Sequence, residues 1–228
     1  MNQLVKIKIC GIREEEHVNL LIEEGVDAIG TVINVPKSPR NLSVKRALAI
    51  KRILPPFIDF VCVTIPNSIS GIITLERILN PDVIQLHALE SESFFKEIRK
   101  KTKIKLIISL PIDQDGNSKV INNDPIISSK ILAKYCDALL IDTYSEITIG
   151  GSGILNNLEI AKEVKEVIEI PLILSGGLNP DNIINAIQQV RPYAVDVSSG
   201  VESSPGIKDE GLIVNFIKNA REVSYKNE

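Results

Sequence analysis

Apolar runs of strand length alternate eight times along the chain with amphipathic stretches of helical length. Strict strand–helix alternation predicts a parallel sheet, and eight units favour one closed (β/α)8 TIM barrel, an α/β fold that spans residues 1–228 as a single domain. A doubly wound open sheet is the alternative, but the first strand is not followed by a G-x-G-x-x-G turn. The expected strands are Val5–Cys10, Ala28–Ile33, Phe60–Ile65, Val83–His87, Lys105–Ser109, Ala138–Asp142, Leu172–Leu174 and Ala194–Val197. Helices are expected near 14–24, 43–54, 71–79, 91–101, 126–135, 155–167, 181–190 and 209–223, with Ser43 and Ser91 as N-caps.

Alternation within the strands predicts which side chains point into the barrel. In the first strand Val5, Ile7 and Ile9 share an apolar face that should meet the helices, so Lys8 and Cys10 should point inward. By the same alternation, Gln85 and His87 share a face, Asp142 lies opposite Leu139 and Ile141, and Asp196 points inward. Cys10, His87 and Asp142 all fall at the carboxyl ends of strands, where barrel enzymes carry out their chemistry.

Two turns of small residues follow the last two strands. Ser175-Gly176-Gly177 comes after one, and Ser198-Ser199-Gly200 comes after the other. Such turns let backbone N–H groups approach an anion closely, and in (β/α)8 barrels this is the usual phosphate position. Asn179 is expected to cap the intervening helix Asp181–Val190, with Pro180 at its first position. The sequence therefore predicts one phosphate site between the two turns.

Composition narrows the possible partners and compartment. The net charge of −3 provides no basic stripe for nucleic acid, and no apolar run is long enough for a membrane span. The N-terminus lacks the features of a signal peptide. The cysteines Cys10, Cys62 and Cys136 are widely separated, with neither metal-ligand spacing nor a disulfide pattern. We expect a soluble cytoplasmic protein without a metal.

Several motifs together resemble a known family. They are Lys8-Ile9-Cys10-Gly11-Ile12, Pro36-Lys37-Ser38-Pro39-Arg40, Gln85-Leu86-His87, Leu140-Ile141-Asp142-Thr143, Gly150-Gly151-Ser152-Gly153, Ser175-Gly176-Gly177-Leu178-Asn179-Pro180, Val195–Glu202 and Pro205–Asp209. In this order and spacing they resemble the phosphoribosylanthranilate isomerase family, and the likeness spans nearly the whole chain. Each motif is weak alone, but the ordered set is specific.

The resemblance implies a (β/α)8 barrel that acts in tryptophan biosynthesis. The implied reaction is the Amadori rearrangement of N-(5-phosphoribosyl)anthranilate to 1-(2-carboxyphenylamino)-1-deoxyribulose 5-phosphate. Cys10 is then the general base and Asp142 the general acid. Arg40 is expected to bind the anthranilate carboxylate and His87 to line the site. The partner is thus a small phosphosugar–anthranilate substrate; no cofactor is implied, and the chain is expected to be a monomer or a homodimer.

The two catalytic groups need opposite shifts of their pKa values. A free thiol has a pKa of about 8.5 and must lose its proton to act as a base, whereas a free Asp, with a pKa of about 3.9, must keep one. We therefore expect a cation near Cys10, either Lys8 or Arg40. Asp196 is expected to form a structural ion pair with Lys6 or Lys8.

The chain departs from the family pattern at three places. The glycine that usually follows Gln-Leu-His is Ala88, an aromatic second strand is replaced by Gly30-Thr31-Val32-Ile33, and a frequent lysine on the fifth strand is Ile108. None of these changes removes a catalytic group. Two alternatives are a related aminosugar-phosphate isomerase of histidine biosynthesis, which uses two aspartates, and a non-catalytic phosphosugar-binding barrel. Cys10 argues against the first, and retention of both Cys10 and Asp142 argues against the second.

Overall fold

The computed structural model describes residues 4–87, 89–143 and 158–224. Its strands are β1 (Lys6–Cys10), β2 (Ala28–Ile33), β3 (Asn41–Leu42), β4 (Asp59–Thr64), β5 (Val83–Leu86), β6 (Lys105–Ile112), β7 (Ala138–Thr143), β8 (Leu172–Ser175), β9 (Ala194–Val197), β10 (Glu202–Ser204) and β11 (Ile207–Lys208). Its helices are α1 (Glu15–Glu23), α2 (Val44–Ile53), α3 (Ile69–Leu79), α4 (Glu92–Lys101), α5 (Pro125–Leu132), α6 (Leu158–Val167), α7 (Ile183–Val190) and α8 (Glu210–Ser224). No helix in the described ranges is both long and apolar enough to cross a membrane.

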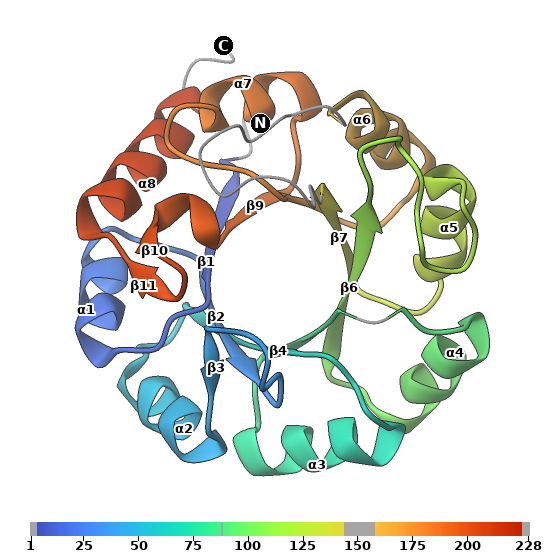
Figure 1. Cartoon of the computed structure of the whole chain (residues 1–228), viewed down its shortest axis with the longest axis horizontal. Helices are drawn as coiled ribbons and strands as arrows, with labels where there is room; N and C mark the ends of the chain where they lie inside the picture. The colour runs from blue at the N-terminus through green and yellow to red at the C-terminus, as the bar shows by residue number, and fades with distance from the viewer. Residues whose placement is uncertain (1–3, 88, 144–157, 225–228) are drawn as a thin grey trace.

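The parallel strands close into a barrel surrounded by helices (Figure 1). Around the ring the order is β1-β9-β8-β7-β6-β5-β4-β2, and β1 pairs with β2 to complete it, while β3 extends β2. Lys8 on β1 lies opposite Asp196 on one side and Ala28 on the other. The predicted (β/α)8 fold is confirmed.

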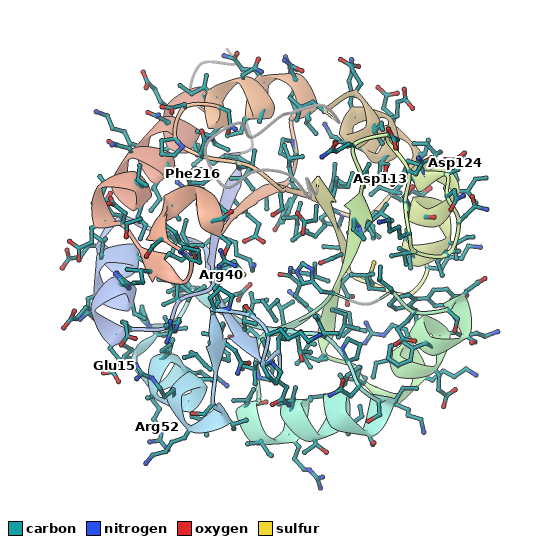
Figure 2. All side chains as sticks on the ribbon, viewed as in Figure 1. Glu15, Arg40, Arg52, Asp113, Asp124 and Phe216 are labelled. Atoms are coloured by element: carbon teal, nitrogen blue, oxygen red, sulfur yellow. The ribbon has the colours of Figure 1, made fainter. Side chains whose placement is uncertain are left out.

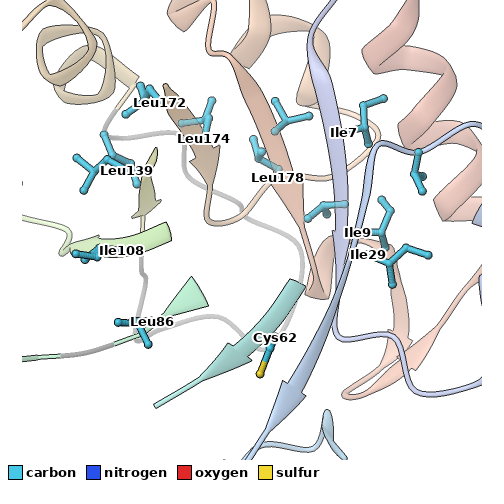
Figure 3. Packing of buried hydrophobic residues seen from close by; sticks show 14 of the residues in the cluster. Ile7, Ile9, Ile29, Cys62, Leu86, Ile108, Leu139, Leu172, Leu174 and Leu178 are labelled. Carbon is cyan, nitrogen blue, oxygen red and sulfur yellow. The ribbon is translucent and has the colours of Figure 1, made fainter. Parts of the chain in front are cut away.

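Two apolar layers are separated by the sheet. The larger lies between the strands and the helices and contains Ile7, Ile9 and Ile29, which Figure 3 shows close together. The smaller layer lies inside the barrel and includes Cys10 and Val32. The predicted alternation in β1 is therefore confirmed, since its isoleucines face the helices and Cys10 faces the interior.

A repeated contact fixes how the strands begin. The contact occurs in the units β1-α1-β2, β4-α3-β5 and β6-α5-β7, where an aspartate stands just before the second strand. The aspartate donates its backbone N–H to the carbonyl of a residue in the first strand, and its carboxylate accepts the backbone N–H of that same residue. The carboxylate contacts are Asp27 with Ile7 (2.9 Å), Asp82 with Phe60 (2.8 Å) and Asp137 with Leu106 (2.8 Å). In the fourth unit Tyr193 donates its N–H to Leu172 but has no carboxylate. We call the backbone hydrogen bond of this contact, which all four units share, a latch. The latches recur every 55 or 56 residues, at 27, 82, 137 and 193.

Some element boundaries differ from the predictions. Helix α7 begins at Ile183 and not at Asp181, because Asn179 accepts the N–H groups of Asp181 (2.9 Å) and Asn182 (3.1 Å) and holds a separate turn there. Ser91 precedes α4 but forms no capping hydrogen bond to the backbone, since its hydroxyl pairs with that of Ser93. Strand β6 continues to Ile112, beyond the predicted Ser109.

Candidate active site

Cys10 ends β1 with its side chain buried inside the barrel. Two residues earlier on the same face, Lys8 Nζ lies 2.8 Å from Asp196 Oδ1, and both side chains are almost fully buried. The predicted partner of Asp196 is thus Lys8. Lys6 pairs instead with Asp27 (2.7 Å), at the opposite end of the strand.

Gly30, on the neighbouring strand β2, leaves the space in which Cys10 and Lys8 meet. A Cβ atom at position 30 would lie 3.1 Å from Cys10 Sγ and 3.1 Å from Lys8 Nζ, so the two atoms converge on one point. Burial raises the pKa of the Cys10 thiol, and the positive charge of Lys8 partly offsets this rise. Burial alone would lower the pKa of Lys8. The nearby Asp196 and Cys10 have the larger combined effect, so the Lys8 pKa is raised. Lys8 is therefore the predicted cation beside the thiol.

A second cation, Lys208 on β11, was not predicted from the sequence. Its Nζ donates to Ser198 O at 2.8 Å and lies 2.9 Å from Glu202 Oε1, with 1% of the side chain exposed. Burial lowers the pKa of Lys208, which Glu202 partly restores. The positive charge of Lys208 also acts on Cys10 and favours its thiolate.

Asp142 and His87 form the other titratable pair. Asp142 lies near the end of β7, opposite Ser175 of β8. Burial raises the pKa of Asp142 and lowers the pKa of His87, although each group partly counteracts the shift of the other. The side-chain amide of Gln85 lies within hydrogen-bond distance of His87 Nε2, at 2.8 Å. Both pKa shifts favour the uncharged form of the group, which is a neutral imidazole for His87 and a protonated carboxyl for Asp142.

Arg40 lies between β2 and β3, and Figure 2 shows it inside the ring of helices, on the side of the barrel where β1 and β2 lie. Its Nε and Nη2 atoms form a bidentate pair with the carboxylate of Glu202, at 2.7 and 2.6 Å. The Arg40 stem crosses Gly11, where a Cβ atom would lie 2.6 Å from Arg40 Cδ. A guanidinium has five N–H donors, so three remain after Glu202 is bound.

The two small-residue turns are brought into contact. Gly176 and Gly177 have φ values of +86° and +65°, which glycine adopts readily. Gly200 packs directly on the backbone of the first turn, because a Cβ atom there would overlap the carbonyl oxygen of Leu178. Ser198 Oγ donates to the carbonyl of Cys10 at 3.2 Å, which ties the second turn to the end of β1. Ser199 begins a short 3₁₀ turn in the same segment.

The departures from the family pattern lie on both faces of the sheet or outside the described residues. Ile108 belongs to the helix-facing layer, and Thr31 lies on the same strand face as Ile29 and Ile33 of that layer. Val32 belongs to the inner layer with Cys10. Ala88 and the motif Gly150–Gly153 lie outside the described residues.

Glu202, Lys208 and Gly30 are the site residues that sequence reasoning missed. The sequence offered one signal for the first two, since Glu202 ends the family motif Val195–Glu202 and Lys208 lies in the next one, Pro205–Asp209. Nothing in the sequence pairs them with Arg40, which lies 162 positions before Glu202.

Comparison with known proteins identifies the family. The family described as N-(5'phosphoribosyl)anthranilate (PRA) isomerase matches residues 7–219. The chain belongs to the phosphoribosylanthranilate isomerase family. The predicted family is confirmed, and with it an isomerase of tryptophan biosynthesis.

Individual members of the phosphoribosylanthranilate isomerase family match along nearly their full lengths. The chain is 38% identical to the N-(5'-phosphoribosyl)anthranilate isomerase of Methanocaldococcus jannaschii over 97% of this chain and 99% of the relative. It is 36% identical to that of Methanopyrus kandleri, over 96% and 100%. Among solved structures, the phosphoribosyl anthranilate isomerase of Thermotoga maritima has a TM-score of 0.81 at 34% identity, with 96% of this chain and 99% of the other covered. Another, in complex with reduced 1-(o-carboxyphenylamino)-1-deoxyribulose 5-phosphate, has a TM-score of 0.78 at 33% identity, over 96% and 99%.

Proposed function

We propose that this chain converts N-(5-phosphoribosyl)anthranilate to 1-(2-carboxyphenylamino)-1-deoxyribulose 5-phosphate, with Asp142 as the general acid and Cys10 as the general base. The observation that carries the proposal is the placement of both groups at the carboxyl ends of barrel strands, Cys10 beside Lys8 and Asp142 beside His87. Members of the family are named for this isomerisation, and one is solved with a reduced form of the product.

The acid step suits Asp142. Opening of the furanose ring to a Schiff base requires a proton on the ring oxygen, and burial raises the pKa of Asp142 so that the carboxyl retains one. His87 counteracts this effect only when it is charged, and burial lowers its pKa and favours the neutral ring. The pair therefore supplies a proton donor without a permanent charge.

The base step suits Cys10. Removal of the C2 proton from the Schiff base gives an enolamine, which tautomerises to the ketone. Burial alone makes the thiol a poor base at neutral pH, because it disfavours the thiolate. Lys8 and Lys208 stabilise the negative charge that appears when the thiol is deprotonated. The proton removed from C2 then resides on the Cys10 sulfur.

The remaining residues suit the two charged ends of the substrate. We assign the phosphate to the contacting turns at Gly176-Gly177 and Ser198–Gly200, where small residues allow close approach of backbone N–H groups. We assign the anthranilate carboxylate to Arg40, whose guanidinium keeps donors beyond those that Glu202 accepts. The three cysteines are free thiols, which fits a reducing compartment, and we propose the cytoplasm as the site of action.

Turnover of freshly generated N-(5-phosphoribosyl)anthranilate, followed by fluorescence, tests this proposal. We expect activity in the wild type and losses of about 10²- to 10⁴-fold in kcat for Cys10→Ser and for Asp142→Asn. Cys136→Ser is the matched control, because this buried thiol lies in the helix-facing layer and donates a hydrogen bond to Leu132 O.

Other outcomes are equally informative. Activity that survives both substitutions would retain the function and reject Cys10 and Asp142 as its acid and base. An inactive wild type that still binds phosphate esters would reject the function and favour the histidine-pathway isomerase or the binding-only barrel.

A further inference from the structure

A short hairpin, β10–β11, follows the second small-residue turn and lies next to β1 (Figure 1). Glu202 begins this hairpin, and only 3% of its side chain is exposed. A buried carboxylate is costly unless its oxygens are hydrogen-bonded. The partners of Glu202 therefore indicate what it stabilises.

Both carboxylate oxygens of Glu202 accept two hydrogen bonds each. Oε1 accepts from Arg40 Nε (2.7 Å) and Lys208 Nζ (2.9 Å). Oε2 accepts from Arg40 Nη2 (2.6 Å) and from the N–H of Gly206 (3.0 Å). Burial alone would raise the Glu202 pKa, but Arg40, Lys208 and the Gly206 N–H together lower it. Glu202 is thus held as a carboxylate, and half of its bonds go to Arg40.

The backbone on either side of this ion pair is also in contact. Gly206, at the tip of the hairpin, packs against the residue before Arg40, because a Cβ atom there would lie 2.7 Å from Pro39 O. On its other side the Arg40 stem rests on Gly11. The arginine is therefore fixed at its backbone, along its stem and at one edge of its guanidinium.

Because Glu202 binds one edge of the Arg40 guanidinium in a bidentate manner, it also determines where the opposite edge of that planar group points. Because Glu202 occupies Nε–H and one Nη2–H, the free donors are the two on Nη1 and the second on Nη2. These donors lie at the outer edge of a planar group whose orientation Glu202 sets. A preorganised arginine loses less conformational freedom when it binds a second carboxylate.

We propose that Glu202 is a positioning residue that orients Arg40 toward the carboxylate of the substrate, so that it sets selectivity for an aromatic amine carrying an ortho carboxylate. This inference rests on the proposed function, in which Arg40 binds that carboxylate. Glu202 itself touches no reacting atom in this proposal.

The test compares two substrates: N-(5-phosphoribosyl)anthranilate and the corresponding aniline compound, which lacks the carboxylate. For Arg40→Ala we expect the preference in kcat/KM for the carboxylate substrate to disappear. For Glu202→Gln we expect that preference to fall about tenfold, since the amide keeps one acceptor oxygen and replaces the other with an NH2 group that cannot accept from Arg40. The fall should appear mainly in KM of the carboxylate substrate, while kcat for the two substrates should change by the same factor, because any effect that passes through Lys208 is common to both. Glu14→Gln is the matched control, because Glu14 pairs with Arg46 at 2.7 Å on the exposed surface.

A double variant separates positioning from general structure. If Glu202 acts through Arg40, Glu202→Gln should change KM no further in the Arg40→Ala background. A Glu202→Gln variant that keeps the full preference while Arg40→Ala loses it overturns the inference and leaves the proposed role of Arg40 intact. Equal losses on both substrates overturn it as well, because they indicate damage to the fold or to Lys208. Retention of the preference by Arg40→Ala rejects the proposed role of Arg40 and, with it, this inference.

Discussion

Lys8 Nζ lies 2.8 Å from Asp196 Oδ1, across the seam where the first and last strands of the barrel meet. With 4% and 5% of their side chains exposed, neither charge is stable there without the other. Asp196 therefore helps to hold the proton on Lys8 and places a cation beside Cys10. The contact that closes the barrel also sets the electrostatics of the proposed base.

Removal of this cation should make Cys10 harder to deprotonate. In Lys8→Met the burial that raises the Cys10 pKa would remain, while the largest opposing charge would be lost, so the thiol pKa should rise further. We expect alkylation of Cys10 by iodoacetamide to need a higher pH than in the wild type. The rate is measured against pH by mass spectrometry of the peptide that contains Cys10, and kcat at neutral pH should fall in parallel.

The control for this prediction addresses folding. Lys8→Met alone leaves Asp196 buried and unpaired, at a cost of about 3–5 kcal/mol. The double variant Lys8→Met/Asp196→Asn removes both charges and should fold more stably. Its Cys10 pKa should still rise, but less than in Lys8→Met, because the Asp196 charge that is also removed raises the Cys10 pKa. A folded double variant with a wild-type alkylation profile would contradict the role of Lys8.

Gly30→Ala should impair catalysis without straining the backbone. Gly30 lies in a regular strand, so the new methyl group would be resisted by Cys10 Sγ and by Lys8 Cε and Nζ, all at 3.1 Å. Small displacements of reacting groups can be costly, and we expect kcat/KM to fall on the order of 10- to 100-fold. Steady-state kinetics measures the effect. Gly71→Ala, on the exposed face of α3, is the control, and equal activity of the two variants would refute the prediction.

The sequence predicted the barrel and the inward positions of Lys8 and Cys10, because strand alternation is a property of the local backbone. It also predicted the first of the two small-residue turns, since glycine marks backbone conformations such as the positive φ of Gly176 and Gly177. It did not predict the Arg40–Glu202 pair, which joins two loops that no periodicity connects. The start of α7 was predicted wrongly because Asn179 forms a turn of its own before the helix.

Thr31→Val should stabilise the protein. The Thr31 side chain is fully buried, and its hydroxyl has no hydrogen-bond partner among the described residues. Valine has a similar shape without the unsatisfied polar atom, so we expect a gain of about 1 kcal/mol. That corresponds to a rise in Tm of about 2–4 °C for a chain of this length, measured by calorimetry.

Ser128→Ala supplies the comparison for Thr31→Val. The buried Ser128 hydroxyl contacts Val120 O (2.7 Å) and Asn122 O (2.8 Å), so its removal should lower Tm. Destabilisation by Thr31→Val of the same size would show that both hydroxyls are satisfied.

At acid pH, Asp27 should no longer contribute to the free energy of unfolding. Burial raises the pKa of its carboxyl, but hydrogen bonds from Lys6, the Ile7 N–H and Arg221 outweigh it, and the pKa is lowered in the folded chain. As the pH falls below about 3.9, the unfolded chain binds a proton before the folded chain does. The stabilisation is therefore complete above that pH and is lost as the pH falls through the lower pKa of the folded chain.

The measurement is urea unfolding of the wild type and Asp27→Asn at pH 7 and pH 3. At pH 7 the variant should be less stable by about 1 kcal/mol, because Asp27 is partly exposed and its ion pairs are screened. At pH 3 the difference should shrink. A difference that stays constant with pH would show that the charge of Asp27 contributes nothing.

The latches at Asp27, Asp82, Asp137 and Tyr193 follow one another at intervals of 55 or 56 residues and mark four βαβ modules in the barrel. Each latch joins residues only 20 to 31 positions apart, so the entropy cost of closing each loop is small and nearly the same. Within a module, each latch therefore aligns two strands through residues that are close in the sequence. A circular permutant with new ends in the loop after α2 or after α4 would leave every module whole, whereas one opened in the loop before β5 would split a latch between its two termini.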